Sequence, residues 1–250
     1  MQKFFGLEVT GKLDSNTLEV MSKPRCGVSD ISRYGHFRGK PKWKKSTVTY
    51  RITRYTRDLS QKEVDATISQ AFKLYSDIIP LDFQQIHSGT ADIIILFKGR
   101  NHGDFFPFDG PNGVLAHATS PGPGQGGDTH FDDDEKWTLS RKGFNLLLVA
   151  AHEFGHALGL DHSRDRTALM YPTYKYVETR GYKLPRDDRL GVQALYGGQY
   201  WGVRGEMTLP GYPKPITEFG FPTSVTKIDS AVHMARKGRT YFFVKDKYWR

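Results

Sequence analysis

The sequence has a single cysteine, Cys26, among 250 residues, which excludes a framework of internal disulfides. Its longest apolar runs, Ile93–Phe97 and Leu146–Ala151, are far shorter than the roughly 20 residues that a membrane-spanning helix needs. The first residues contain no apolar stretch suited to a signal peptide, so either the chain stays in the cytosol or its natural start lies upstream. The sequence also lacks an Asn-x-Ser/Thr acceptor, so glycosylation gives no indication of compartment. We therefore predict no membrane span and leave the compartment open.

The composition excludes a disordered chain, because 38% of the residues are hydrophobic and 13% are aromatic. The formal net charge is +9, but it is unevenly distributed. Nine Lys and Arg and no acids lie from Arg33 to Arg57, whereas five acids and no Lys or Arg lie from Asp128 to Glu135. We interpret this as a basic surface strip beside an acidic pocket. The strip is either merely solvated or binds sulfated glycans, acidic matrix or nucleic acid.

Hydrophobic periodicity predicts an α+β fold, a mixed twisted sheet with packed helices. Alternation over Thr47–Ile52 predicts a strand, and helical spacing over Gln61–Ile79 predicts an amphipathic helix. Leu81–Phe83 and Asp92–Phe97 are predicted as further strands, and this strand–helix–strand order favours a mixed sheet with a helix packed on it. A strongly apolar helix is predicted over Phe144–Leu158.

The chain divides into three predicted segments. Residues 1–33 contain a short helix but are too short for a core of their own. Residues 34–197 hold the predicted sheet and helices. Residues 198–250 carry a Tyr-Trp pair at both ends, and this spacing is typical of one repeat of a β-propeller, so we expect a partial propeller segment there (Tyr200-Trp201 and Tyr248-Trp249).

One string in the chain has the pattern H-E-x-x-H-x-x-G-x-x-H. On a helix, His152 and His156 lie on one face and can share a metal ion. Gly159 lets the chain leave the helix and brings His162 round as a third nitrogen ligand. Three imidazoles on zinc leave a fourth position open, which is typical of a catalytic site, and Glu153 is placed to act as general base in peptide hydrolysis. The alternative is a helix whose histidines are only packed or solvated.

A second cluster precedes this helix in a segment rich in glycine and proline. Three imidazoles and one carboxylate make a closed tetrahedral shell, which is typical of structural zinc (His102, Asp104, His117 and His130). A loop-rich segment of this length needs something other than apolar packing to order it. Its acidic and glycine-rich stretches offer oxygen ligands of the kind that calcium prefers. The alternative for these stretches is a solvated acidic turn.

The single cysteine has two interpretations. An isolated cysteine is usually a small buried hydrophobe. On a detachable N-terminal segment, however, the Cys26 thiolate can take the fourth zinc position and keep an enzyme latent. We favour the second interpretation.

Taken together, these motifs resemble the secreted matrix metalloproteinases of the stromelysin and collagenase group, from Met1 to about Gly197. Pro24–Val28 is similar to the cysteine switch of this family, and the histidine string followed by Met170 is similar to the zinc site and Met-turn of metzincins. The resemblance implies two zinc ions and two or three calcium ions. The implied calcium ligands are Asp109, Gly110, Asn112, Val114, Asp132 and Glu135 in one site, Asp92, Gly124, Gly126 and Asp128 in another, and Asp58, Asp133 and Glu135 in a third.

The resemblance also implies a secreted, zinc- and calcium-dependent endopeptidase acting on extracellular matrix proteins. Residues 1–33 would be the C-terminal part of a propeptide cut near Arg33–Tyr34, and residues 198–250 part of a hemopexin-like region. Leu148 matches the position that lines the primary specificity pocket, which suggests a preference for residues such as leucine. Ser29 stands where the family usually has proline, which we expect to loosen the switch. We expect a monomer whose partners include tissue inhibitors of metalloproteinases and heparin-like glycans.

Two rival functions remain. One is a catalytically silent, metal-stabilised module that holds matrix or glycosaminoglycan through its basic strip, and the presence of Glu153 argues against it. The other is a nucleic-acid binder, which rests only on the net charge and lacks any recognisable reading motif. We therefore predict an enzyme without a nucleic-acid partner.

Overall fold

The computed structural model describes residues 2–30, 36–79, 81–104, 106–200, 203–204, 207–209, 214–222, 225 and 228–250. The predicted cleavage point near Arg33–Tyr34 and Trp201 of the predicted repeat lie outside the described residues. Within the described part of the chain, no helix combines the length and apolar character needed to cross a membrane.

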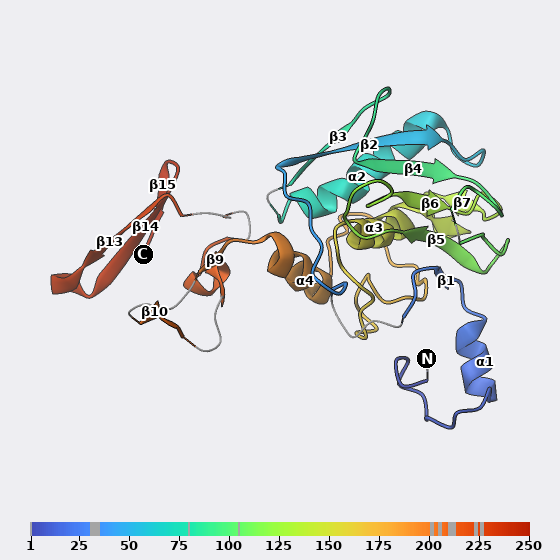
Figure 1. The fold of residues 1–250 in the computed structure, drawn as a ribbon, viewed down its shortest axis with the longest axis horizontal. Coiled ribbons are helices and arrows are strands. Elements are labelled where there is room, and N and C mark those ends of the chain that lie inside the picture. The colour runs from blue at the N-terminus through green and yellow to red at the C-terminus, as the bar shows by residue number, and fades with distance from the viewer. Residues whose placement is uncertain are drawn as a thin grey trace.

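The helices and strands follow one another along the chain in an order that begins with a short helix and ends in a small sheet (Figure 1). Their bounds are α1 Ser15–Met21, β1 Arg25–Cys26, β2 Thr47–Arg54, α2 Gln61–Ser76, β3 Asp82–Gln85, β4 Ile93–Phe97, β5 Val114–Ala118, β6 Thr129–Phe131, β7 Trp137–Thr138, β8 Phe144–Asn145, α3 Leu146–Ala157, α4 Arg186–Tyr196, β9 Gln199–Tyr200, β10 Val203–Arg204, β11 Met207–Thr208, β12 Lys214–Pro215, η1 Ile216–Phe219, β13 Ser230–Met234, η2 Ala235–Lys237, β14 Arg239–Val244 and β15 Lys247–Trp249.

A six-stranded sheet in the order β1-β5-β6-β4-β2-β3 is the framework of the fold. β5 runs antiparallel to β6, and the other neighbouring pairs of this sheet are parallel. α2 and α3 contribute to the same apolar core as the sheet, and the rings of Phe72 and Phe154 stack between these helices with centroids 3.8 Å apart. The mixed sheet with packed helices confirms the predicted α+β fold.

The local sequence explains where α2 begins. The Ser60 side chain accepts from the Glu63 amide and the Glu63 carboxylate accepts from the Ser60 amide, which is a capping box. The helix ends at Ser76 rather than at the predicted Ile79, although Ile79 is still buried in the core. Its apolar face is buried as the spacing predicts.

α3 is buried along its whole length, as its apolar run predicts. The Asn145 side chain caps its first turn, so the helix begins at Leu146 rather than at the predicted Phe144. Phe144 and Asn145 instead form β8, which pairs with β7. Neither β1 nor α4 was predicted from the sequence.

The C-terminal part has its own small sheet and its own small core. β13, β14 and β15 form a three-stranded antiparallel sheet beyond α4 (Figure 1). Ile216, Phe221 and Val225 form an apolar cluster that is separate from the main core. The assignment of this part to a propeller remains a prediction.

Candidate metal centre and active site

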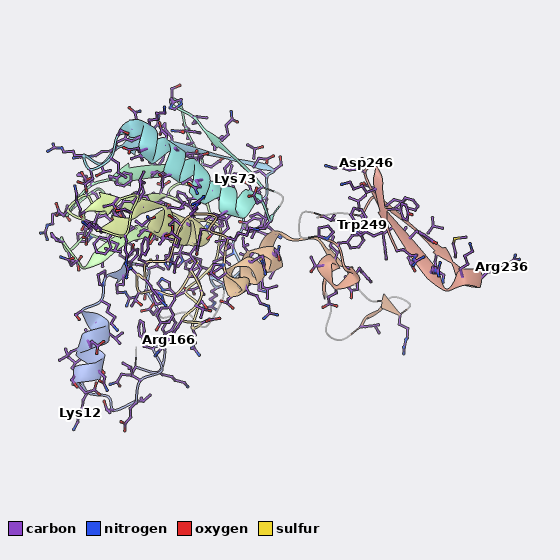
Figure 2. The ribbon with its side chains drawn as sticks, turned by 180° about the vertical axis from the view of Figure 1, so that it is seen from behind. Lys12, Lys73, Arg166, Arg236, Asp246 and Trp249 are labelled. Atoms are coloured by element: carbon purple, nitrogen blue, oxygen red, sulfur yellow. The ribbon has the colours of Figure 1, made fainter. Side chains whose placement is uncertain are left out.

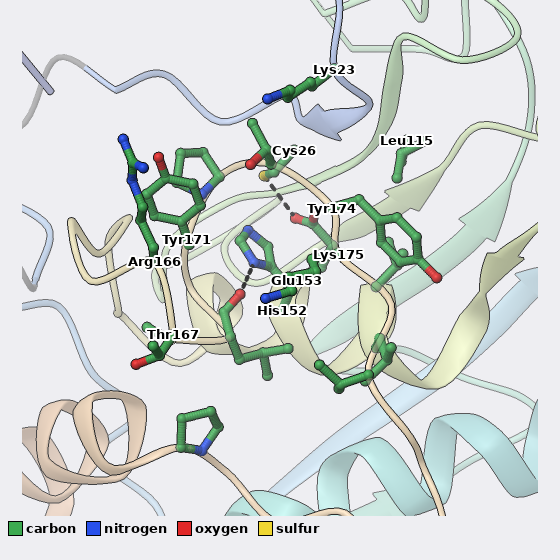
Figure 3. Close-up of a pocket in the computed structure, with 18 of the residues that line it drawn as sticks. Lys23, Cys26, Leu115, His152, Glu153, Arg166, Thr167, Tyr171, Tyr174 and Lys175 are labelled. Carbon is green, nitrogen blue, oxygen red and sulfur yellow. Dashed lines mark hydrogen bonds between the residues drawn. The ribbon is translucent and has the colours of Figure 1, made fainter. Parts of the chain in front are cut away.

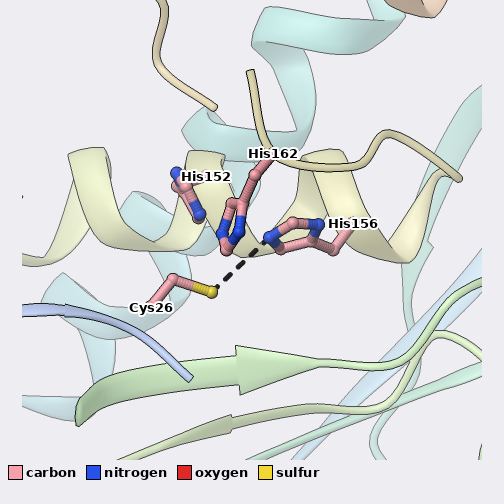
Figure 4. A group of neighbouring side chains, drawn as sticks. All are labelled: Cys26, His152, His156 and His162. Carbon is pink, nitrogen blue, oxygen red and sulfur yellow. Dashed lines mark hydrogen bonds between the residues drawn. The ribbon is translucent and has the colours of Figure 1, made fainter. Parts of the chain in front are cut away.

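Three histidines from one stretch of chain converge beneath the sheet. His152 and His156 lie on successive turns of α3, and His162 follows the turn at Gly159 (Figure 4). Gly159 has a φ of +103°, and a Cβ there would lie 2.2 Å from the Pro41 carbonyl oxygen. Only glycine satisfies both conditions, so this residue determines where His162 is placed.

Each of the three imidazoles is held through its Nδ1 atom. His152 Nδ1 donates to the Leu169 carbonyl at 2.7 Å, and His156 Nδ1 donates to the Leu160 carbonyl at 2.8 Å. His162 Nδ1 donates to the Asp30 carboxylate at 2.7 Å. Because these oxygens only accept, each Nδ1 carries the proton and each Nε2 presents a lone pair.

The Nε2 atoms point to a common position that also receives the thiol of Cys26. Cys26 Sγ lies 3.5 Å from His156 Nε2, and the four candidate ligand atoms lie within 4.8 Å of one another. Tetrahedral zinc, with bonds of about 2.05 Å to nitrogen and 2.3 Å to sulfur, would separate these two ligands by about 3.6 Å. Within the described residues, Nε2 of His152 and of His162 has no hydrogen-bond partner. The donor set therefore fits zinc.

Burial keeps His152 and His156 in the neutral form that binds a metal. It lowers the pKa of His152 to about 3 and the pKa of His156 well below its ordinary value. Glu153 is 1% exposed, and burial raises its pKa to about 8. Its Oε2 lies 3.5 Å from Cys26 Sγ (Figure 3). A carboxyl group with this pKa, beside the histidines, is suited to take up and release a proton near neutral pH.

A turn under α3 carries Met170, as its sequence position predicts. Met170 is 2% exposed, and a Cβ on Gly155 would lie 2.3 Å from its sulfur, so methionine and helix backbone are in close contact. The Asp188 carboxylate accepts from the Leu169 and Met170 amides, both at 2.8 Å. This buried carboxylate from α4 thus fixes the turn whose Leu169 carbonyl holds His152.

Two extended edges flank the histidines, and β1 lies between them. On one side, β1 runs parallel to β5, with the Gly27 amide donating to the Ala116 carbonyl at 2.8 Å. On the other, the Cys26 amide donates to the Pro172 carbonyl at 2.9 Å, and the Tyr174 amide donates to the Pro24 carbonyl at 2.8 Å. The cleft is therefore built to hydrogen-bond an extended polypeptide.

A cavity of about 520 Å³ opens beside this cleft. Leu148, which is 3% exposed, lines it together with His152 and Glu153. Its other walls include Tyr171 and Tyr174 (Figure 3). Leu148 thus lines a cavity next to the histidines.

The second predicted cluster also comes together. The Asp104 Oδ2 atom lies 3.0 Å from His102 Nε2, 2.7 Å from His117 Nε2 and 2.9 Å from His130 Nδ1. His117 Nε2 lies 3.3 Å from both His102 Nε2 and His130 Nδ1, which is the separation of two nitrogens on tetrahedral zinc, about 3.3 Å. Burial lowers the pKa of His117 to about 4, which favours the neutral form of this imidazole.

Comparison with known proteins agrees with this geometry. The sequence model of the matrixin family matches residues 42–197. The chain belongs to the matrixin family. A second family model, described as a peptidoglycan binding domain, matches residues 1–21.

Two relatives match this matrixin over its whole length. Human matrix metalloproteinase-20 is 47% identical, and the match covers 100% of this chain and 61% of the human protein. Mouse stromelysin-1 is 41% identical, with 100% of this chain and 72% of the mouse protein covered. The match to the human protein runs over 295 residues, 45 more than the 250 residues of this chain. The chain thus spans about three fifths of that relative.

The acidic side chains predicted to bind calcium have mixed surroundings in this matrixin. Asp132 and Glu135 are buried, and within the described residues Asp132 Oδ2 and Glu135 Oε1 have no hydrogen-bond partner. Burial and the neighbouring Asp132 raise the pKa of Glu135 to about 7. Asp109, nearby, accepts from the Val114 amide at 2.8 Å. These crowded carboxylates are of the type that a cation stabilises.

The other two predicted calcium sites already contain protein donors. Asp92 pairs with Lys45 at 2.6 Å and also accepts from Thr49. Asp128 accepts from the Ile94 amide at 2.8 Å. Asp58 pairs with Lys136 and accepts from the Trp137 amide at 2.8 Å. Among the other predicted ligands, Gly110, Asn112 and Gly124 have positive φ. Gly126 packs on the Gly122 backbone. One carboxylate oxygen of Asp133 has no hydrogen-bond partner among the described residues.

Sequence reasoning missed two carboxylates near the histidines. Asp30 pairs with Arg25 at 2.6 Å and holds His162, and Asp188 holds the turn with Met170. Asp30 lies 132 residues from His162 and Asp188 lies 18 residues from Met170, so no local spacing marks these two contacts. Asp30 sits four residues after Cys26, just beyond the resembling motif Pro24–Val28, and this proximity was the one available signal.

Proposed function

We propose that this matrixin is a zinc-dependent endopeptidase that hydrolyses peptide bonds of extracellular matrix proteins. The observation that carries the proposal is the convergence of three Nδ1-anchored imidazoles on one point, with the Glu153 carboxyl beside it. A closed structural site has no use for a neighbouring, protonatable carboxyl group. Since the chain spans only part of its human relative, its activity, substrates and partners all belong to this proposal.

The chain's own residues would divide the work. His152, His156 and His162 would hold the ion, which when bound supplies Lewis acidity to polarise the scissile carbonyl and acidify a water molecule. Glu153 would take the proton of the attacking water and pass it to the leaving amine. β5 and the segment 172–174 would bind the substrate main chain, as they bind β1. Leu148 would receive an apolar side chain following the scissile bond.

The second cluster would hold a structural zinc ion. His102, Asp104, His117 and His130 close a complete shell and leave no position for a substrate. Calcium at the Asp109–Glu135 region and at the two other predicted sites would stabilise the surrounding loops. Both roles concern the fold rather than the reaction.

We also propose that residues 1–33 act as the latency segment of a zymogen. In support, the thiol of Cys26 lies at the common point of the histidines, and β1 fills the cleft that a substrate would need. Cutting near Arg33–Tyr34 would release this segment from the domain of residues 34–197. Residues 198–250 would form the hemopexin-like part. We further propose that the protein is secreted, and that inhibitor proteins and sulfated glycans bind to it.

The test is cleavage of a quenched peptide containing a Gly-Leu bond by the full chain. A mercurial removes the Cys26 thiol from the histidines. Activity that appears only after this treatment and disappears with a chelator supports both the enzyme and its latency. Activity without the mercurial supports the enzyme alone. No activity in protein shown to contain zinc would favour the rival, a silent matrix-binding module.

A further inference from the structure

The N-terminal segment contacts the main domain at a second residue, Phe5, in addition to Cys26. Among residues 2–24, Phe5 and Thr17 are buried, and Phe5 is 3% exposed. Phe5 contacts Arg166 and Tyr171 of the main domain, and the Arg25 guanidinium of its own segment lies 6.0 Å from the centroid of its ring. The segment is therefore held by an aromatic residue 21 positions before the cysteine.

Two side chains of the main domain contact Phe5 in different ways. Arg166 Nη2 donates to the Phe5 carbonyl at 2.8 Å. The Tyr171 ring meets the Phe5 ring edge to face, with centroids 5.8 Å apart and planes at 89°. Beside them, the Arg164 guanidinium lies over Phe4, 5.7 Å from the ring centroid. The main domain thus contacts both the main chain and the aromatic ring of Phe5.

The loop that presents Arg166 is held by hydrogen bonds of its own. The Asp165 carboxylate accepts from the Thr167 amide at 2.8 Å, and the Ser163 amide donates to the Met170 carbonyl at 2.9 Å. Tyr171 follows directly on the buried Met170. A preorganised surface loses little conformational freedom when it binds a partner.

This surface continues into the catalytic cleft. Phe5, Arg166 and Tyr171 line the same cavity of about 520 Å³ as His152 and Glu153. Figure 3 shows Arg166 and Tyr171 on one side of this cavity and Glu153 further in. A polypeptide bound in the cleft can therefore extend to the place that Phe5 occupies.

We propose that Arg166 and Tyr171 form a docking site for an aromatic residue of an extended polypeptide. In this chain Phe5 fills the site and holds the N-terminal segment independently of Cys26. Docking of Phe5 does not depend on the proposed function, because it needs no proteolysis.

The competing explanation is that Phe5 is only an apolar contact, without preference for an aromatic ring or for Arg166. Binding in trans distinguishes the two. The receptor is the full chain with Phe5→Ala, and the probe is a labelled peptide with the sequence of residues 2–13. A matched probe carries alanine in place of Phe5, and binding is followed by fluorescence anisotropy.

We expect the phenylalanine probe to bind at least about tenfold more tightly than the alanine probe. A leucine probe should fall between them, and Arg166→Gln in the receptor should weaken binding of the phenylalanine probe while Arg180→Gln, an exposed control, does not. Equal or undetectable binding of all probes, or no effect of Arg166→Gln, would overturn the docking site. These binding measurements do not depend on proteolysis, so they remain valid even if the proposed enzymatic function is wrong.

The anchoring role is measured separately in the zinc-loaded full chain. Phe5→Ala, Phe5→Leu and Arg166→Gln should each accelerate the reaction of Cys26 with a thiol reagent, with Phe5→Ala accelerating it about tenfold. Leu13→Ala removes an apolar side chain of the same segment that is 67% exposed, and should change the rate less than about twofold. Unchanged rates in the Phe5 and Arg166 variants would show that Cys26 alone holds the segment.

Discussion

The two histidine clusters differ in where their fourth ligand comes from. In the second cluster, Asp104 lies two residues from His102, and all four side chains belong to one stretch of 29 residues. In the first cluster, Cys26 lies 130 residues before His156 and on a separate segment. A ligand built into its own loop cannot leave without unfolding that loop. A ligand on a distant segment can leave while the three histidines stay in place.

The second difference is what surrounds each cluster. Glu153 lies beside Cys26 in the first, and a cavity adjoins it. In the second, Phe108 stacks on His102 with centroids 4.4 Å apart and helps to cover the histidines. Very similar donors therefore suit two different proposed roles, and the clusters differ in access, in the neighbouring Glu153 and in the origin of the fourth ligand.

The largest expected effect separates chemistry from metal binding at the first cluster. Glu153→Gln should lower peptide cleavage by about 10²–10⁴-fold, because the group that moves the proton is lost. Both zinc equivalents should remain by metal analysis, since Glu153 is not a ligand. Glu178→Gln, an exposed control, should cleave normally. Activity within about tenfold of the unchanged chain would remove Glu153 from its proposed role.

Removing the fourth ligand should have opposite consequences at the two clusters. Cys26→Ala should raise cleavage without mercurial by at least about tenfold and keep both zinc ions, because the adjoining cavity lets a water molecule take the fourth position. Asp104→Ala should instead lose one zinc equivalent and about 3 kcal/mol of stability, near 10 °C in melting temperature. Metal analysis gives the zinc content of the two variants, and calorimetry gives their melting temperatures. Equal zinc loss in both would contradict the distinction between the clusters.

Asp188, which supports the first cluster through the Met170 turn, gives a smaller effect that depends on pH. Asp188→Asn should cost about 1–3 kcal/mol at pH 7, because an amide group turns toward one of the two backbone N–H donors. Burial raises the pKa of Asp188 to about 6 in the folded chain, so protonation favours folding as the pH falls below that value. The stability gap between the two proteins should therefore widen from pH 7 to pH 4. Urea titrations that show a constant gap would contradict this.

The smallest effect concerns the loop that carries Cys26. Ser29→Pro restores the residue usual in the resembling motif and restricts the free segment, which is worth about 0.4–1 kcal/mol. Reaction of Cys26 with a thiol reagent should slow about two- to fivefold. A faster reaction would mean that the loop needs a conformation that proline cannot adopt.

The sequence predicted the parts of the site that depend on local spacing. The interval between His152 and His156 places both on one helix face, and Gly159 marks the turn that follows. The strands β2 and β4 likewise follow from short apolar or alternating patterns. In each case the determining interaction lies within a few residues along the chain.

Interactions between distant segments could not be predicted in the same way. β1 is two residues long and forms because β5 and the segment 172–174 offer unpaired edges. Asp30 and Asp188 act on loops 132 and 18 residues away. α4 was missed because its buried apolar residues, Val192, Leu195 and Tyr196, span too short a stretch to show a helical period. Such contacts depend on how the segments pack, which no single window of sequence contains.

The strand β1 binds in the cleft while still joined to the rest of the chain. A tethered ligand competes at a local concentration in the millimolar range, far above that of most proteins in solution. Detaching the thiol of Cys26 therefore opens the cleft only for as long as β1 stays away, and the strand can return. Cutting the tether converts this to an encounter between two molecules, where dilution alone prevents rebinding. The covalent connection between β1 and β2 thus decides whether opening is reversible.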